Sequence, residues 1–242
     1  PIEIVAVSEL AIEMSYSSNA IAFKNSTNFE LGGDHTIHIS ADNPSYANID
    51  FITDNSGNVV LSNLSIVGSD DLVDVAHGYG TNLLDTLLLD RIHLESQVAG
   101  KNLIRVKGAP SLVVLKNVSA VSSVLNQTLM EVNLQAGGDL GIYNSIFDGF
   151  DTDASKHKWI QLSMQPVTSS YLANSVSMIN NTFVNLANSH VGSTSNFRLL
   201  HKVGTGYIDS LILVNNAINK SAIESELTNV NYNNSSNEIL TI

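Results

Sequence analysis

A short motif that returns once every 26 to 37 residues constrains this chain more than any other feature. The motif reads apolar residue, any residue, then usually asparagine. Its six copies are Leu61-Ser62-Asn63, Leu89-Asp90-Arg91, Leu115-Lys116-Asn117, Ile142-Tyr143-Asn144, Ile179-Asn180-Asn181 and Val214-Asn215-Asn216. Their third positions are 63, 91, 117, 144, 181 and 216, so the separations are 28, 26, 27, 37 and 35 residues. Such intervals indicate the coils of a solenoid, with larger loops in the last two coils.

Asparagine occupies the third position of the motif in five of the six copies. Asparagine tolerates the left-handed backbone region better than other non-glycine residues, so the motif predicts one sharp bend between two strands in each coil. Stacked coils would then align these side chains along one edge in a hydrogen-bonded ladder. The predicted ladder consists of Asn63, Asn117, Asn144, Asn181 and Asn216.

A second strand precedes most of the bends, because apolar and polar residues alternate there with a period of two. The five segments are Ile49 to Thr53, Leu103 to Lys107, Leu129 to Asn133, Trp159 to Ser163 and Phe197 to His201. The repeat and these segments predict an all-β fold, a right-handed parallel β-helix with an asparagine ladder. A β-sandwich is the alternative, since it also contains many short strands at regular spacing.

We expect a single domain, in which residues 1–48 form an N-terminal capping coil or strands and residues 49–242 form the parallel β-helix. Helical stretches are few, and the best candidates are Val7 to Met14 and Ala222 to Leu227. The chain starts at Pro1 without Met, and no basic segment followed by an apolar one precedes the fold. We therefore expect that a leader has been removed.

Charge and cysteine content exclude several classes of function. Asp and Glu number 23 against 11 Lys and Arg, and the net charge of −12 opposes broad docking onto nucleic acid or anionic lipid. No apolar run approaches the roughly 18 residues that a membrane span needs. The chain has no cysteine, which excludes disulfides, thiolate metal sites and cysteine nucleophiles. We expect neither a nucleic-acid partner nor a membrane-spanning segment.

The segments "IDFITDNSGNVVLSNLSIVG", "VSMINNTFVNLANS" and "LILVNNAINKS" resemble the pectate-lyase-like β-helix superfamily. They look most similar to the Bacteroidetes surface β-helix proteins related to chondroitinase B and alginate lyase. The resemblance runs from about Ile49 to Ile218. It implies a polysaccharide as the ligand and an extracellular or outer-membrane location. The expected function is a carbohydrate-interacting surface or secreted protein, and the alternatives are a polysaccharide lyase and a structural adhesin module.

Period-two alternation also predicts one outward-facing polar patch on three consecutive coils. The patch consists of Arg105, Lys107, Glu131, Asn133, Gln161 and Ser163, with His201 as an extension. A uronate lyase needs a cation for the sugar carboxylate and a base for the C5 proton, which makes Arg105 and Lys107 the catalytic candidates. The simpler interpretation is that Arg105 and Glu131 form an ordinary cross-strand ion pair.

Calcium is the one metal that the sequence suggests. Asp148, Asp151 and Asp153 alternate and could supply oxygen ligands, but the full calcium loop and its closing glutamate are absent, so a solvated turn is the alternative. Asp70, Asp71 and His77 resemble elements of polygalacturonases. The separation of six positions between Asp71 and His77 is too short for one coil, which favours coincidence.

Exposed aromatic rings are a further expectation, because the apolar face of a pyranose stacks on such rings. Trp159, Tyr171 and Tyr207 lie at strand or loop edges, where stacking could occur. Packing against the core or the edge of the sheet is the alternative for each of them.

Overall fold

The computed structural model describes residues 2–6, 10–14, 21–24, 27–41, 49–53, 56–68, 72–75, 83–97, 102–106, 110–122, 128–135, 137–149, 158–164, 171–186, 198–203 and 207–220. Every regular element within these residues is a β-strand. The helix expected over Val7 to Met14 is therefore wrong for residues 10–14, which form β2 (Leu10–Met14). Residues 10, 12 and 14 are apolar and alternate with Ala11 and Glu13, which is the period of a strand. The other helix candidate, Ala222 to Leu227, lies outside the described residues.

The larger of two sheets has two arms joined at a bend. The first arm, before the bend, contains β1 (Ile2–Ala6), β4 (Thr27–Gly33), β11 (Leu112–Lys116), β14 (Asp139–Tyr143), β17 (Tyr171–Ile179) and β20 (Tyr207–Val214). The second arm, after the bend, contains β2, β5 (Ile37–Ala41), β12 (Ser119–Ser122), β15 (Ile146–Gly149), β18 (Thr182–Leu186) and β21 (Ala217–Lys220). Two long strands, β7 (Ser56–Gly68) and β9 (Leu83–Ser96), run through the bend and belong to both arms.

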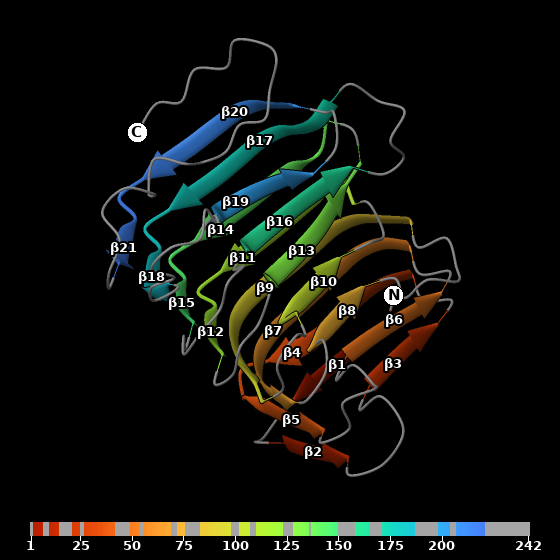
Figure 1. Cartoon of the computed structure of the whole chain (residues 1–242). Coiled ribbons are helices and arrows are strands. Elements are labelled where there is room, and N and C mark those ends of the chain that lie inside the picture. Colours follow the sequence, from red (N-terminus) through yellow and green to blue (C-terminus); the bar gives the residue numbers. More distant parts are fainter. Residues whose placement is uncertain are drawn as a thin grey trace.

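The second sheet lies across the core from the first arm (Figure 1). Its strands are β3 (Ile21–Lys24), β6 (Ile49–Thr53), β8 (Val73–Val75), β10 (Ile104–Val106), β13 (Thr128–Leu134), β16 (Lys158–Met164) and β19 (Arg198–Val203). Five of them, β6, β10, β13, β16 and β19, confirm the strands that alternation predicted there. The strand β8 was not predicted from the sequence.

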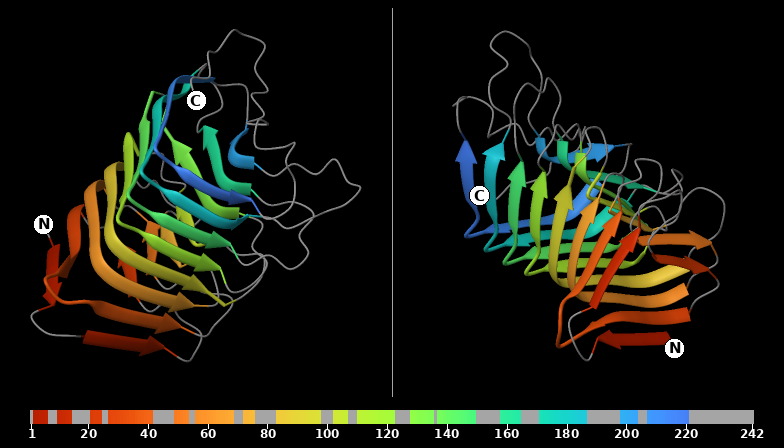
Figure 2. Two further views of the ribbon diagram at one scale, coloured as in Figure 1. Left: turned by 90° about the vertical axis from the view of Figure 1, so that its left-hand side faces the viewer. Right: turned by 90° about the horizontal axis from the view of Figure 1, so that it is seen from below.

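All pairings among the described strands are parallel, and each strand inside the stack pairs with its counterparts in the preceding and following coils. Figure 2 shows the same order as a steady change of colour from red at one end of the stack to blue at the other. The antiparallel hairpins of a β-sandwich do not occur in this part of the chain. The arrangement is an all-β fold of parallel sheets, compatible with a parallel β-helix. Strands β1 to β5, within residues 2–41, pair in the same two sheets.

The core consists of inward side chains that stack from coil to coil. Leu61, Leu89 and Leu115 are register neighbours on the first arm, and each is 0–1% exposed. On the second arm the rings of Phe147 and Phe183 stack with centroids 5.2 Å apart and an interplanar angle of 10°. Such continuous columns bury apolar surface at every coil, which is the main favourable contribution to folding.

In six successive coils of the described chain, the bend between the arms lies at a residue with positive φ. These residues are Asn63, Arg91, Asn117, Asn144, Asn180 and Asn215, with φ between 50° and 58°. The predicted bend is confirmed at Asn63, Asn117 and Asn144. In the last two coils the prediction is wrong by one residue, since the first asparagine of each Asn-Asn pair occupies the bend.

Bend side chains form an outer ladder along the edge. The Asn117 amide donates to Asp90 Oδ1 at 2.9 Å. Farther along, the Asn180 amide donates to Asn144 Oδ1 at 3.3 Å, and the Asn215 amide donates to Asn180 Oδ1 at 2.8 Å. Asn63 donates to the backbone carbonyl of Gly33. The predicted ladder is therefore confirmed in part: side-chain bonds between asparagines join Asn144, Asn180 and Asn215, whereas Asn63 and Asn117 bond to Gly33 and Asp90.

The residues that directly follow the bend form a second, buried ladder. The position just after the bend carries apolar Leu64, Ile92 and Val118 in the earlier coils, and each of these is at most 2% exposed. Polar residues replace them in the later coils, where Ser145 and Asn181 are each 1% exposed. The reason for this change is visible in the hydrogen bonds that the polar residues make.

Each rung of the inner ladder accepts a backbone hydrogen bond from the coil before it. Ser145 N donates to Asn181 Oδ1 at 2.9 Å, and Asn181 N donates to Asn216 Oδ1 at 3.0 Å. The Asn181 amide also donates to the carbonyl of Ile142 at 2.9 Å. Buried polar groups are tolerated here because each has a partner.

Arg91 is the residue least suited to its bend, because a long side chain at positive φ is strained where asparagine or glycine is not. Its contact with Asp90 is 3.6 Å long and its side chain is 58% exposed, so this ion pair contributes little. Arg91→Asn should raise the free energy of unfolding by about 1 kcal/mol, measured by urea denaturation. Arg91→Ala, which has a Cβ at the same φ but lacks the short polar side chain that lets asparagine hydrogen-bond locally, is the control. Equal stabilities of the two variants would contradict the strain argument.

Asn181 should be far more important to stability than its neighbour Asn180. Asn181→Leu leaves the buried Ser145 N–H and Ile142 carbonyl without their partner, at a cost of about 3 kcal/mol in the free energy of unfolding. Asn180→Gly keeps the positive φ and removes only exposed hydrogen bonds, so it should cost less than about 1 kcal/mol. Denaturant titration of both variants measures the difference. Similar losses in the two would show that the inner ladder has no special role.

Candidate functional site

The second sheet carries the polar row expected from the sequence. Arg105 is the register partner of Glu131, Glu131 of Gln161, and Gln161 of His201. Arg105 and Glu131 are partly exposed, and each lies between two buried neighbours on its strand. The side chains of Gln161 and His201 are outside the described residues, although their backbones are in the row.

The parallel row two residues further along is less exposed than expected. Asn133 was predicted on the surface but is only 3% exposed, so it is not available to a ligand. Alternation predicts direction but not whether other parts of the chain cover a side chain. Ser163 is the register partner of Asn133, but its side chain is not among those described. Lys107, the proposed base, lies outside the described residues.

Two acidic residues that the sequence analysis missed stand in the same row as Arg105. Asp74 in β8 is the register partner of Arg105, and Asp50 in β6 is the register partner of Asp74. The backbone of Arg105 is therefore paired with Asp74 on one side and with Glu131 on the other, and the side chains of Asp50 and Asp74 are not among those described. The sequence did contain a signal for Asp50, because this residue is at the second position of a strand that the sequence predicted.

The metal candidates are not brought together by the described part of the chain. Asp148 lies in β15, with Val121 and Val184 as its register partners, while Asp151 and Asp153 lie outside the described residues. Where side chains are described, no group of three or more His, Cys, Asp or Glu residues could hold a metal ion. Asp70, Asp71 and His77 also lie outside the description.

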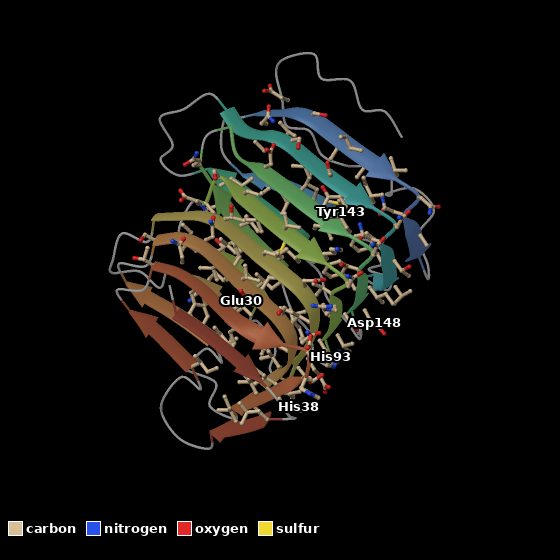
Figure 3. The ribbon with its side chains drawn as sticks, turned by 180° about the vertical axis from the view of Figure 1, so that it is seen from behind. Glu30, His38, His93, Tyr143 and Asp148 are labelled. Carbon is tan, nitrogen blue, oxygen red and sulfur yellow. The ribbon has the colours of Figure 1, made fainter. Side chains whose placement is uncertain are left out.

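Tyr143 is the described aromatic residue best placed for a ligand, and the sequence analysis overlooked it. Trp159, Tyr171 and Tyr207 lie in β16, β17 and β20, but their side chains are not described. Tyr143 is partly exposed on the outer face of the first arm, where Figure 3 labels it. Its signal was the Gly141-x-Tyr143 spacing, which puts a glycine and a ring on the same face of one strand.

The ring of Tyr143 fills the space above Gly141. A Cβ built on Gly141 would lie 2.5 Å from Cε2, 2.7 Å from the hydroxyl oxygen and 2.8 Å from Cζ of Tyr143. The register neighbours of Gly141 are Val114 in β11 and Ser177 in β17, and Ser177 is only 8% exposed. The glycine thus makes a gap in the outer row of side chains, and the ring lies in that gap.

The row that contains Tyr143 also contains a cation. Lys116 in β11 is the register partner of Tyr143 and is exposed, and Ile179 in β17 is the partner on the other side. In Figure 3, Glu30 and Tyr143 lie on the first arm, and His38, His93 and Asp148 lie on the second. His93 approaches Glu95 at 4.0 Å, and both side chains are well exposed, so this contact contributes little.

The fold and the site thus define a class, an all-β chain of parallel sheets whose outer faces carry side chains in rows. No family model matches the chain, and neither the curated proteins nor the solved structures contain a match. Within the described residues, no helix has the length and apolar character to cross a membrane.

Gly141→Ala should displace the Tyr143 ring, because the new methyl group would overlap the end of a flexible side chain. The free energy of unfolding should fall by about 1 kcal/mol or less, since the ring can rotate away from the backbone. The displaced ring should become more reactive toward tetranitromethane, with nitration of Tyr143 followed by peptide mass spectrometry. The nitration rates of the other tyrosines are the internal control. An unchanged rate at Tyr143 would contradict the packing described here.

Proposed function

We propose that this chain is a right-handed parallel β-helix of the pectate-lyase-like type that binds a polysaccharide on the outer face of the first arm. The observation that carries the proposal is the partly exposed ring of Tyr143, held above Gly141 in a row of outward side chains. A pyranose presents an apolar face that stacks on such a ring. A ring that is already positioned loses little side-chain entropy when it binds.

The strand pairing and the bends support the proposal that the fold is a right-handed parallel β-helix. Parallel pairing of every described strand with the next coil, together with one bend per coil, is the pattern that a β-helix requires. Parallel strands connected by a crossover are right-handed in about 98% of cases, which supports the proposed hand. The quoted sequence segments support the superfamily.

A polymer ligand suits this surface better than a small molecule does. Register pairing repeats the same position at intervals of about 4.8 Å along the stack, so one row of side chains can contact successive units of a chain. The resemblance of the segments to surface β-helix proteins supports a place outside the cell or on the outer membrane. Of the alternatives, the lyase has less support, because the acidic Glu131 is the register partner of Arg105.

Glycan-array screening followed by calorimetry on the strongest ligand tests the proposal. Tyr143→Ala should weaken binding by about tenfold, since it removes the stacking surface. Ile146→Ala is the matched control, because Ile146 is an apolar side chain on the second arm, 52% exposed, and its loss should leave affinity unchanged.

The same incubations, followed by ultraviolet absorbance, detect the unsaturated uronates that a lyase would release. Binding without growth in absorbance supports a binding protein. A protein that binds no glycan on the array, or equal affinity of Tyr143→Ala and the parent chain, would contradict the proposal.

A further inference from the structure

Two histidines lie in one outward row of the second arm. His38 in β5 is the register partner of Ser65 in β7, and Ser65 is the register partner of His93 in β9. Each of the three is partly exposed and lies between two buried neighbours on its strand, so all three side chains point outward. Figure 3 labels both histidines on this face. The row therefore presents two imidazoles with a serine between them.

The spacing of this row suits two imidazoles that share one ion. Neighbouring coils are about 4.8 Å apart, so the Cα atoms of His38 and His93 are about 9.6 Å apart. An ion midway between them is about 4.8 Å from each along the stack, which an imidazole side chain can span with a metal–nitrogen bond of about 2.0–2.1 Å. Because the intervening residue is Ser65, only a small side chain stands between the two rings.

Glu95 adds a carboxylate beside the second imidazole. It lies two residues after His93 on the same face of β9, and its Oε2 is 4.0 Å from His93 Nε2. A histidine that binds a metal usually donates its other ring N–H to such a carboxylate, which here leaves Nδ1 for the metal. The contact is longer than a hydrogen bond, and the two side chains, 41% and 37% exposed, can close it by rotating.

The surroundings of this row favour a cation. The net charge of the chain is −12, and such a charge raises the local concentration of cations. After the bend, the strands of the second arm from β2 to β18 contain no lysine or arginine. Imidazole nitrogens suit Zn²⁺, Cu²⁺ and Ni²⁺, whereas Ca²⁺ and Mg²⁺ take oxygen ligands. The chemistry of the row therefore selects a transition metal.

We propose that His38 and His93 chelate one transition-metal ion, Zn²⁺, Cu²⁺ or Ni²⁺, above Ser65 on the outer face of the second arm. The chain supplies two imidazole ligands and water completes the coordination, so the affinity is lower than that of a structural zinc site with four protein ligands. The bound ion bridges β5 and β9 across β7 and connects three successive coils. This site lies on a different face from the proposed polysaccharide surface and does not depend on it.

Calorimetry of the full chain with Zn²⁺ alone, and then with Cu²⁺ and Ni²⁺, tests the site. At least one of these ions should bind, and an equal concentration of Ca²⁺ should not displace it. The same ion should raise the midpoint of urea unfolding, because only the folded chain holds the two rings at this spacing. Absence of binding and of a shift in the midpoint with all three ions would overturn the proposal.

Replacement of each histidine shows whether one ion is shared. His38→Gln and His93→Gln should each weaken binding by at least about tenfold, since even the loss of a residue that only orients a ligand has an effect of that size. The double variant should bind no more weakly than either single variant, because one imidazole alone cannot chelate. His35→Gln, the control, removes an exposed histidine before β5 and should leave affinity unchanged. Additive losses from the two single variants, or an equal loss in the control, would contradict a shared ion.

Two serine variants test the position of the ion. Ser65 and Ser119 are the two register partners of His93, and both are partly exposed. Ser65→Leu places a large side chain between the two rings and should abolish measurable binding. Ser119→Leu makes the same change on the far side of His93 and should have no effect, while the midpoints of urea unfolding without metal confirm that both variants fold. Equal affinities of the two variants would overturn the proposal, since the ion would then not lie between His38 and His93.

Discussion

In-register parallel pairing between successive coils is the constraint on which the rest of this structure depends. Over most of the paired strands, each residue stands beside its counterpart one coil away, without an offset. Equivalent side chains therefore repeat about 4.8 Å apart, whether they face the core or the solvent. The side chain that fits at a given position therefore depends more on the residues at that position in the preceding and following coils than on its neighbours in sequence. The stacked rings of Phe147 and Phe183 are an example inside the core.

The left-handed bend repeats from coil to coil, so the bend residues and the residues that follow them form two ladders with different roles. The bend residue itself is at the edge of the sheet, where asparagine reduces strain and connects adjacent coils through exposed amides. The next residue faces the interior, and it is apolar in the earlier coils and polar from Ser145 onward. Val118 N already donates to Ser145 Oγ at 3.0 Å, so the change from apolar to polar occurs where the following coil provides an acceptor. A polar residue at this position without such a neighbour would be a buried group without a partner.

The candidate binding residues of the first arm lie where the regular rows of outward side chains are interrupted. Gly141 interrupts a row of outward side chains, and the ring of Tyr143 occupies the space that results. The outer ladder is interrupted in the same two coils, between Asn117 and Asn144. On the second sheet, the acidic Glu131 is the register partner of Arg105. A regular row is suited to stability, and an irregularity in it leaves groups that a ligand can use.

The sequence by itself determined the all-β class, the recurrence of one bend per coil and five strands of the second sheet, because each depends on a local pattern. Tertiary structure decided the rest. Either asparagine of the pair at residues 180 and 181 can adopt positive φ, and only the adjacent coils determine which one does. The burial of Asn133 and the register pairing of Lys116 with Tyr143 likewise depend on residues far apart in the chain. Coil stacking sets these contacts, and loops of different lengths between coils leave no fixed sequence interval from which to read them.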